Sequence, residues 1–155
     1  MVYIRGAALE SGCLFCRTAR SRKDRENLLL FRGKLSFVMM NLYPYNSGHL
    51  MVAPYRHLAD IEGLTGRESA ELFGLAGKSI QVLNKVMKPQ GYNLGMNLGR
   101  VAGAGVLGHL HLHIVPRWSG DTNFMPVLGE TKVVAEALAA TYEKLSKAFS
   151  LLRQR

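Results

Sequence analysis

Short apolar segments separated by turn residues predict a β-hairpin and a returning strand in the first third of the chain. Apolar runs occupy Asn27–Arg32 and Leu35–Met40, and the Gly33-Lys34 pair between them is typical of a hairpin turn. A third apolar run lies within Gly48–Pro54, bounded by turn residues on both sides. The three segments are therefore expected to pair as neighbouring strands.

Two longer segments have the spacing of amphipathic helices. The first follows Thr65, a good N-cap residue. Its apolar positions recur on one helical face: Leu72, Leu75, Ala76, Ile80, Leu83, Val86 and Met87. The second covers Thr131–Leu152 and ends in basic residues, which suit the negative end of the helix dipole.

Two further strands are predicted between these helices, at Gly91–Leu98 and Leu110–Val115. The order is then a hairpin with a returning strand, a helix, two more strands and a last helix. This order favours an α+β fold with a mainly antiparallel sheet.

The composition limits the class of protein. A length of 155 residues, 48% of them hydrophobic and 20% charged, suits a single domain over 1–155 and excludes a disordered or fibrous chain. Within it we distinguish an N-terminal segment, 1–26, and a C-terminal helix, 130–153. The apolar runs are too short to span a bilayer and no signal-peptide pattern opens the chain, so we expect a cytoplasmic protein.

The net charge of +9 makes nucleic acid and phosphorylated metabolites plausible partners. Part of the excess lies in one short segment: Arg17, Arg20, Arg22, Lys23 and Arg25. A solvated basic face explains such a cluster more simply than a nucleic-acid site. Because no RNA-binding signature accompanies the charge, a nucleic-acid partner is not expected.

Three histidines alternate with aliphatic residues in His109-Leu-His111-Leu-His113. In a strand they would share one face, about 6 to 7 Å apart. Core filling is a poor explanation, because each imidazole has two nitrogens that need partners. Imidazole is both a metal ligand and a nucleophile near neutral pH. Since the outer two are far apart for one ion, we favour one end histidine on a metal and the middle one free to attack.

A glycine-dense segment precedes the histidines, and its Gly103-Ala-Gly105-Val-Leu-Gly108 string matches the dinucleotide fingerprint. That fingerprint must follow a strand and open a helix, whereas this string runs into the β-patterned histidines. A plain flexible turn is the simpler alternative. Beside three histidines, the glycines favour a phosphate pocket lined by backbone N–H groups.

Cys13 and Cys16 form a Cys-x-x-Cys pair, which in the cytosol indicates a redox pair, half of a metal site, or coincidence. A polar Glu-Ser-Gly precedes the pair and a basic segment follows it. This context weakens the redox interpretation, which needs a strand before the pair and a helix after it.

Taken together, these motifs resemble the histidine triad family of nucleotidyl hydrolases and transferases. The likeness rests on the three histidines, the glycine loop before them and Pro116-Arg117-Trp118 after them. It extends back through Leu35–Asn41, Pro44 and Gly48–Pro54, and covers roughly 13–126. Within the family, Ala102–Gly105 and Pro116–Pro126 are most similar to the bacterial diadenosine tetraphosphate phosphorylase branch, a relative of the fragile-histidine-triad hydrolases.

The resemblance implies a histidine-triad-like fold, with a five-stranded mainly antiparallel sheet, one long helix and a C-terminal helix, in a homodimer. It implies that His111 attacks the α-phosphorus of a purine dinucleotide to give a nucleotidyl-histidine, and that His113 orients it and bonds near the bridging oxygen. The implied substrate contacts are Asn41 to the ribose, and Asn97, Gly103, Ala104 and Gly105 to the phosphates. Trp118 suits base stacking and dimer packing equally.

The resemblance also implies a structural zinc site, since some members bind zinc through a Cys-x-x-Cys, a later histidine and the first triad histidine. The matching residues here are Cys13, Cys16, His57 and His109. Such a site would hold the N-terminal segment on the sheet without polarising the phosphate.

One departure from the family bears on the second substrate. Many members carry Gln-Ser or Gln-Thr where this chain has Ala104-Gly105. A polar side chain that could orient water is thus absent, which favours orthophosphate as acceptor, with Arg100 as a candidate contact. The alternatives are hydrolysis with water as acceptor, and a non-catalytic purine nucleotide-binding protein.

Overall fold

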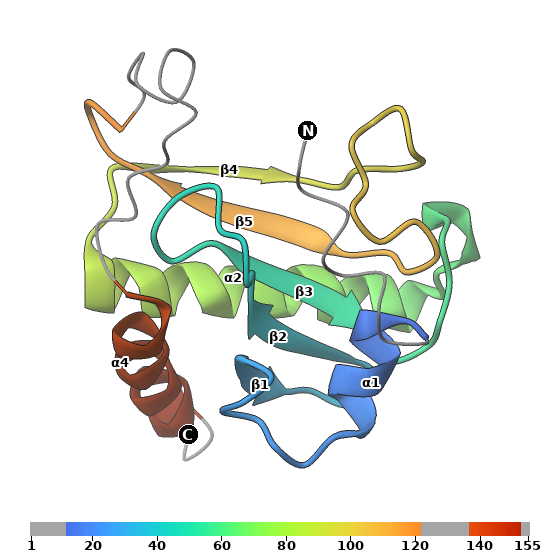
Figure 1. Cartoon of the computed structure of the whole chain (residues 1–155), viewed down its shortest axis with the longest axis horizontal. Coiled ribbons are helices and arrows are strands. Elements are labelled where there is room, and N and C mark those ends of the chain that lie inside the picture. The colour runs from blue at the N-terminus through green and yellow to red at the C-terminus, as the bar shows by residue number, and fades with distance from the viewer. Residues whose placement is uncertain (1–11, 122–136, 153–155) are drawn as a thin grey trace.

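The computed structural model describes residues 12–121 and 137–152, and its centre is a five-stranded sheet (Figure 1). The strand order is β1-β2-β3-β5-β4, and every neighbouring pair is antiparallel. The strands are β1 Leu29–Arg32, β2 Ser36–Met40, β3 Leu50–Pro54, β4 Gly91–Gly95 and β5 Leu112–Arg117. The helices are α1 Leu14–Arg20, the 3-10 turn η2 Ile61–Gly63, α2 Gly66–Met87 and α4 Leu138–Leu152. The predicted α+β fold is confirmed.

Both faces of the central strands are covered, so β2 and β3 are buried along their whole length. Alternate residues such as Val38 and Val52 join the core formed with α2 and α4. The residues between them, such as Phe37 and Met51, join a smaller cluster with Phe15 of α1 on the opposite face. Strands buried on both faces lack polar alternation, which explains their continuous apolar runs.

Helix α2 begins where the sequence predicts. Thr65 and Glu68 form a capping box, in which each side chain accepts a hydrogen bond from the other residue's backbone N–H. Arg56 lies 2.7 Å from the Glu68 carboxylate, and its guanidinium, together with the Thr65 hydrogen bonds, lowers the pKa of Glu68 to about 2. The helix ends at Met87, and the C-cap residue Lys88 has a left-handed φ of 50°. Its buried face includes Ser79, whose hydroxyl donates to the Leu75 carbonyl oxygen.

The return of the chain into β3 depends on Gly48. Its φ is +75°, and a Cβ there would lie 2.6 Å from the Met87 sulfur at the end of α2. A glycine therefore lets the 41–48 loop pass close to the helix.

Several element limits differ from the predictions. β4 ends at Gly95 rather than Leu98, and β5 covers 112–117 rather than 110–115. The backbone N–H of Leu110 donates to the Leu58 carbonyl oxygen instead of joining the sheet, because β3 pairs only with 112–114 of β5.

Helix α1 is not among the elements that the sequence predicts. The parts of the predicted C-terminal helix before 137 and after 152 lie outside the described residues, as do 1–11 of the N-terminal segment and 122–126 of the family-like segment. None of the described helices combines the length and apolarity needed to span a membrane.

Candidate functional site

The three histidines lie at the start of β5, on the face of the sheet that also carries α1. Only His113 belongs to the strand, because β5 begins at Leu112; His109 and His111 precede it. The expectation of one regular strand through all three is therefore wrong. They still lie side by side and are nearly inaccessible, with exposures of 1%, 5% and 8% in chain order. The rings of His111 and His113 are 4.7 Å apart between centroids.

His111 is held with one nitrogen occupied and the other available. Its Nδ1 donates to the backbone carbonyl oxygen of His109 at 2.8 Å, which is the hydrogen bond expected of an attacking imidazole. A carbonyl only accepts, so Nδ1 carries the proton and Nε2 keeps its lone pair. Burial lowers the pKa of His111, and the carbonyl contact opposes this shift in part. A neutral imidazole with a free lone pair is a nucleophile.

His113 is fixed in the opposite tautomer by a chain of hydrogen bonds. The backbone N–H of Tyr45 donates to Nδ1 of His49 at 3.0 Å, so His49 carries its proton on Nε2. That nitrogen lies 2.9 Å from Nδ1 of His113 and donates to it. His113 therefore carries its own proton on Nε2, a buried atom with no hydrogen-bond partner among the described residues. Burial, and then the charge of His111, lower the pKa of His113 to about 4.

His49 is a residue whose role the sequence analysis missed. It is fully buried directly before β3, the strand that pairs with β5. The one sequence feature that could have indicated it is its place directly after Gly48 in the family-like segment. A single histidine beside an apolar strand is more simply explained as a structural core residue. Two side chains of the preceding loop contact it: Asn41 Nδ2 lies 3.4 Å from Nδ1, and the Tyr45 ring packs on both His49 and His113.

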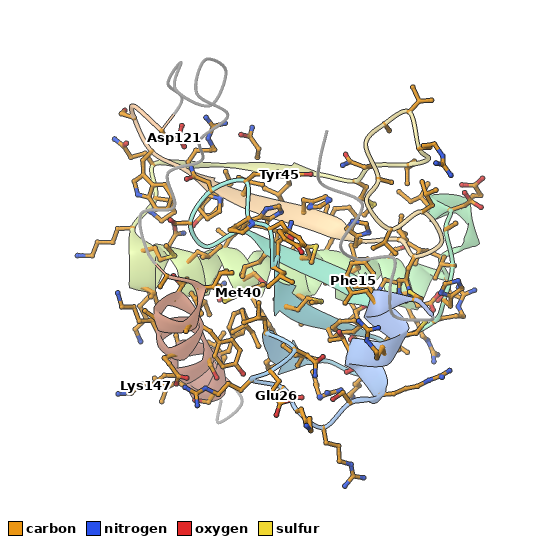
Figure 2. The ribbon with its side chains drawn as sticks, in the orientation of Figure 1. Phe15, Glu26, Met40, Tyr45, Asp121 and Lys147 are labelled. Carbon is orange, nitrogen blue, oxygen red and sulfur yellow. The ribbon has the colours of Figure 1, made fainter. Side chains whose placement is uncertain are left out.

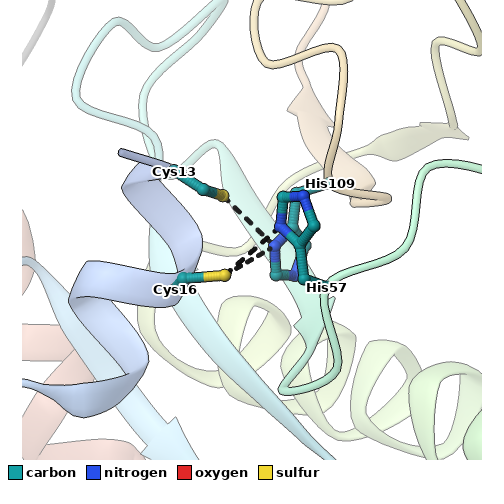
Figure 3. A group of neighbouring side chains, drawn as sticks. All are labelled: Cys13, Cys16, His57 and His109. Carbon is teal, nitrogen blue, oxygen red and sulfur yellow. Dashed lines mark hydrogen bonds between the residues drawn. The ribbon is translucent and has the colours of Figure 1, made fainter. Parts of the chain in front are cut away.

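The first histidine faces the two cysteines (Figure 3). His109 donates from Nε2 to the Pro54 carbonyl oxygen at 2.8 Å, which leaves the lone pair on Nδ1. Nδ1 lies 3.3 Å from the Cys13 sulfur and 3.6 Å from the Cys16 sulfur. Nδ1 of His57 lies 3.3 Å from the Cys16 sulfur. Burial is the main cause that lowers the pKa of His109, which favours the neutral form that binds metals.

These four side chains can hold a metal ion. Their ligand atoms all lie within 4.8 Å of one another, and both cysteines are free thiols. Neighbouring ligands of a tetrahedral zinc are about 3.3 to 3.8 Å apart, given metal–ligand distances of about 2.0 to 2.3 Å. The two sulfur atoms and the two imidazole nitrogens that face them fit that geometry after a small contraction. The cysteines do open helix α1, but the antiparallel sheet of the described chain offers no βαβ unit for a redox pair.

The predicted phosphate loop folds back on itself. Gly103 has a φ of +86° and donates from its backbone to Arg100, while Ala104 donates to Gly99 at 3.4 Å. Two of the three backbone N–H groups assigned to phosphate are thus already occupied within the loop. Asn97 Nδ2 donates to the Gly103 carbonyl oxygen at 3.4 Å, so these two predicted contacts lie together.

The other end of the site is fixed by Asp121, which the sequence analysis did not single out. Its carboxylate accepts hydrogen bonds from Arg117, from Asn46 Nδ2 and from the Trp118 backbone, at 2.6 to 3.0 Å. Asn46 belongs to the loop that carries Asn41, so Asp121 ties this loop to the end of β5. Trp118 is half-buried.

Two residues of the basic segment, Lys23 and Arg25, form ion pairs at the surface. Arg25 pairs with Glu143 at 2.8 Å and Lys23 with Glu26 at 3.1 Å, and the side chains of both pairs are largely exposed. Exposed pairs of this kind contribute little to stability, and they fit a solvated face.

Comparison with known proteins gives a consistent set of relatives. A family model described as HIT domain matches residues 22–120. A Mycobacterium tuberculosis protein named AP-4-A phosphorylase is 49% identical over 123 residues, which are 79% of this chain and 63% of the relative. The chain thus spans less than two thirds of that protein's length. A HIT-like protein of Methanocaldococcus jannaschii is 33% identical over 79% of this chain and 91% of its own length.

Solved structures agree on the fold. A zinc-bound histidine triad family protein from Mycobacterium smegmatis superposes with a TM-score of 0.71 at 20% identity, over 92% of this chain and 96% of that one. The NitFhit protein of Caenorhabditis elegans gives a TM-score of 0.63 at 28% identity, over 79% of this chain and 27% of that one.

Proposed function

Since the chain belongs to the HIT family, we propose that it cleaves dinucleoside polyphosphates at the α-phosphate by nucleotidyl transfer through His111, with orthophosphate as the acceptor. The observation that carries this proposal is the state of His111: Nδ1 donates to a carbonyl oxygen, and Nε2 has no hydrogen-bond partner among the described residues. The 49% identity to the mycobacterial phosphorylase supports the choice of substrate and acceptor.

In the first step, the Nε2 lone pair of His111 forms a bond to the α-phosphorus, and the bond from phosphorus to the bridging oxygen breaks. Diadenosine tetraphosphate would lose ATP in this way and leave AMP on the histidine. His113 presents an Nε2–H donor beside the nucleophile, which suits a hydrogen bond to the departing oxygen. Because the expelled polyphosphate is a stable anion, no strong acid is needed.

In the second step, an oxygen of orthophosphate attacks the same phosphorus and the bond to His111 breaks, which gives ADP and restores the lone pair. Ala104 offers no polar side chain for orienting water, and its methyl group is buried. The backbone N–H of Gly105, the exposed side chain of Arg100 and the amide of Asn97 are the groups we assign to the phosphates. Asn41 is assigned to the ribose.

Product analysis tests the choice of acceptor. We expect diadenosine tetraphosphate with orthophosphate to give ADP and ATP, and omission of phosphate to slow the reaction sharply, because Ala104 offers no polar side chain to orient water. Chromatography of the nucleotides, with and without added phosphate, measures both effects.

Two outcomes would contradict this assignment in different ways. AMP and ATP formed at the same rate without phosphate would make the protein a hydrolase. Binding of the substrate without turnover under any condition would make it a nucleotide-binding protein only.

We also propose that the ion held by Cys13, Cys16, His57 and His109 is zinc. Two thiolates and two imidazoles are ligands that zinc prefers, and four protein ligands leave no open position. The ion would therefore be structural. Bound zinc would keep the thiols ionised and fix His109, whose carbonyl receives the hydrogen bond of His111.

A homodimer is the last part of the proposal. Strand β4 ends the sheet in the described chain, and Leu94 on it and Leu98 just after it are 45% and 46% exposed. Edge strands with exposed apolar residues favour pairing with another chain. We expect light scattering at micromolar concentration to give the mass of two chains, because no strand of the described residues pairs with the outer edge of β4. The mass of one chain would contradict this expectation.

A further inference from the structure

Phe15 connects the metal site with the histidine proposed as nucleophile. It stands between the two cysteines in the sequence, and its side chain is only 1% exposed where α1 meets the sheet (Figure 2). Its ring centroid lies 5.1 Å from that of His109 and 4.8 Å from that of His111. One aromatic ring thus contacts both a candidate metal ligand and the candidate nucleophile.

The position of Phe15 depends on how α1 is held. A helix of seven residues is not stable by itself in water. At its C-terminal end Arg32 donates to the carbonyl oxygens of Ala19 and Ser21, and at its N-terminal end the cysteines face the two histidines. Closing the metal site therefore fixes the end of α1 that carries Phe15.

The contacts of His111 show what this ring adds. The hydrogen bond from Nδ1 fixes one edge of the imidazole but still permits the ring to tilt about that bond. Phe15 lies against the ring at an interplanar angle of 34° and His113 meets it edge-on at 68°. Since phenylalanine cannot form a hydrogen bond through its side chain, it restricts the imidazole without competing for the Nε2 lone pair.

We propose that Phe15 is a positioning residue for His111, through which the metal site sets the direction of the nucleophile. The proposal rests on the proposed function for its catalytic part only. Displacement of an attacking group by about 1 Å can cost about a hundredfold in rate, so a small tilt of the imidazole is sufficient to slow attack.

The test compares Phe15→Leu with Phe37→Leu. Phe37 is equally buried in the same cluster and touches Phe15 and Tyr55, but it has no ring contact with His111 among the described residues. We expect both variants to keep their metal and to lose similar stability. Only Phe15→Leu should lower kcat, by about tenfold or more, with KM within about twofold of wild type, because substrate contacts are unchanged.

A spectroscopic measurement on the free protein separates this proposal from the activity itself. Long-range ¹⁵N–¹H NMR of wild type should show His111 in a single tautomer with Nδ1 protonated, identified by loss of its signals in His111→Ala. Phe15→Leu should shift or broaden these signals and Phe37→Leu should not. Unchanged His111 signals in Phe15→Leu would overturn the proposal whether or not the protein turns over nucleotides, whereas absence of turnover in wild type would count against the proposed function alone.

Discussion

Replacing His111 with alanine is expected to lower turnover of diadenosine tetraphosphate by about a thousandfold or more, while the protein stays folded. The reason is that no other described group offers a free lone pair in the same place. The lone pair of His109 faces the cysteines, and Nδ1 of His113 already accepts from His49. Steady-state kinetics with product detection measure the loss.

The matched control is His111→Asn. Its amide nitrogen can take the place of Nδ1 and donate to the His109 carbonyl oxygen, so the local hydrogen bond is kept while the nucleophile is removed. Both variants should be equally inactive, and the asparagine variant should unfold at a temperature close to that of wild type. Activity above a few per cent in either variant would remove His111 from the role of nucleophile.

Loss of the metal site is expected to be the largest effect on stability. About one zinc per chain should co-purify, and Cys13→Ala should lower both the zinc content and the melting temperature, by about 10 °C or more. The shift is large because metal binding contributes to folding and because a helix of seven residues is not stable by itself. Elemental analysis and thermal unfolding measure the two quantities.

Arg20→Ala is the control for that comparison, since Arg20 is exposed at the other end of the same helix. It should change neither the zinc content nor the melting temperature appreciably. Protein purified without chelators and found free of metal would contradict the zinc proposal. Equal loss of melting temperature in Cys13→Ala and Arg20→Ala would mean that any change in α1 destabilises the protein, whether or not it removes a metal ligand.

The sequence contained strong local signals for much of the fold. The capping residue Thr65 and the apolar spacing after it located α2, and the runs on either side of Gly33-Lys34 located β1 and β2. Strand limits near the histidines were less accessible, because they depend on which residues of β5 find a partner in β3. That pairing is a property of the folded sheet and leaves no periodic trace in the sequence.

The candidate site shows the same division. Three histidines at alternate positions are a recognisable pattern in the sequence. A Cys-x-x-Cys pair indicates half of a metal site, so further ligands can be sought. His49 and Asp121 belong to no such pattern. His49 acts through its contact with His113, 64 positions away, and Asp121 through contacts with Asn46 and with the Trp118 backbone. A single histidine or aspartate near a turn has many ordinary explanations, so only the structure distinguishes these two. The tautomers of His111 and His113 likewise follow from contacts that the sequence does not contain.

The central claim is that a nucleotide is carried on His111, and trapping that species tests it most directly. Protein mixed with diadenosine tetraphosphate in the absence of phosphate, then quenched and digested, should yield a peptide containing His109–His113 with AMP attached at the middle histidine, as measured by mass spectrometry. Addition of orthophosphate before the quench should remove the label and release ADP. Rapid turnover in wild type with no label on His111 at any time, or an equal label in His111→Ala, would contradict the claim.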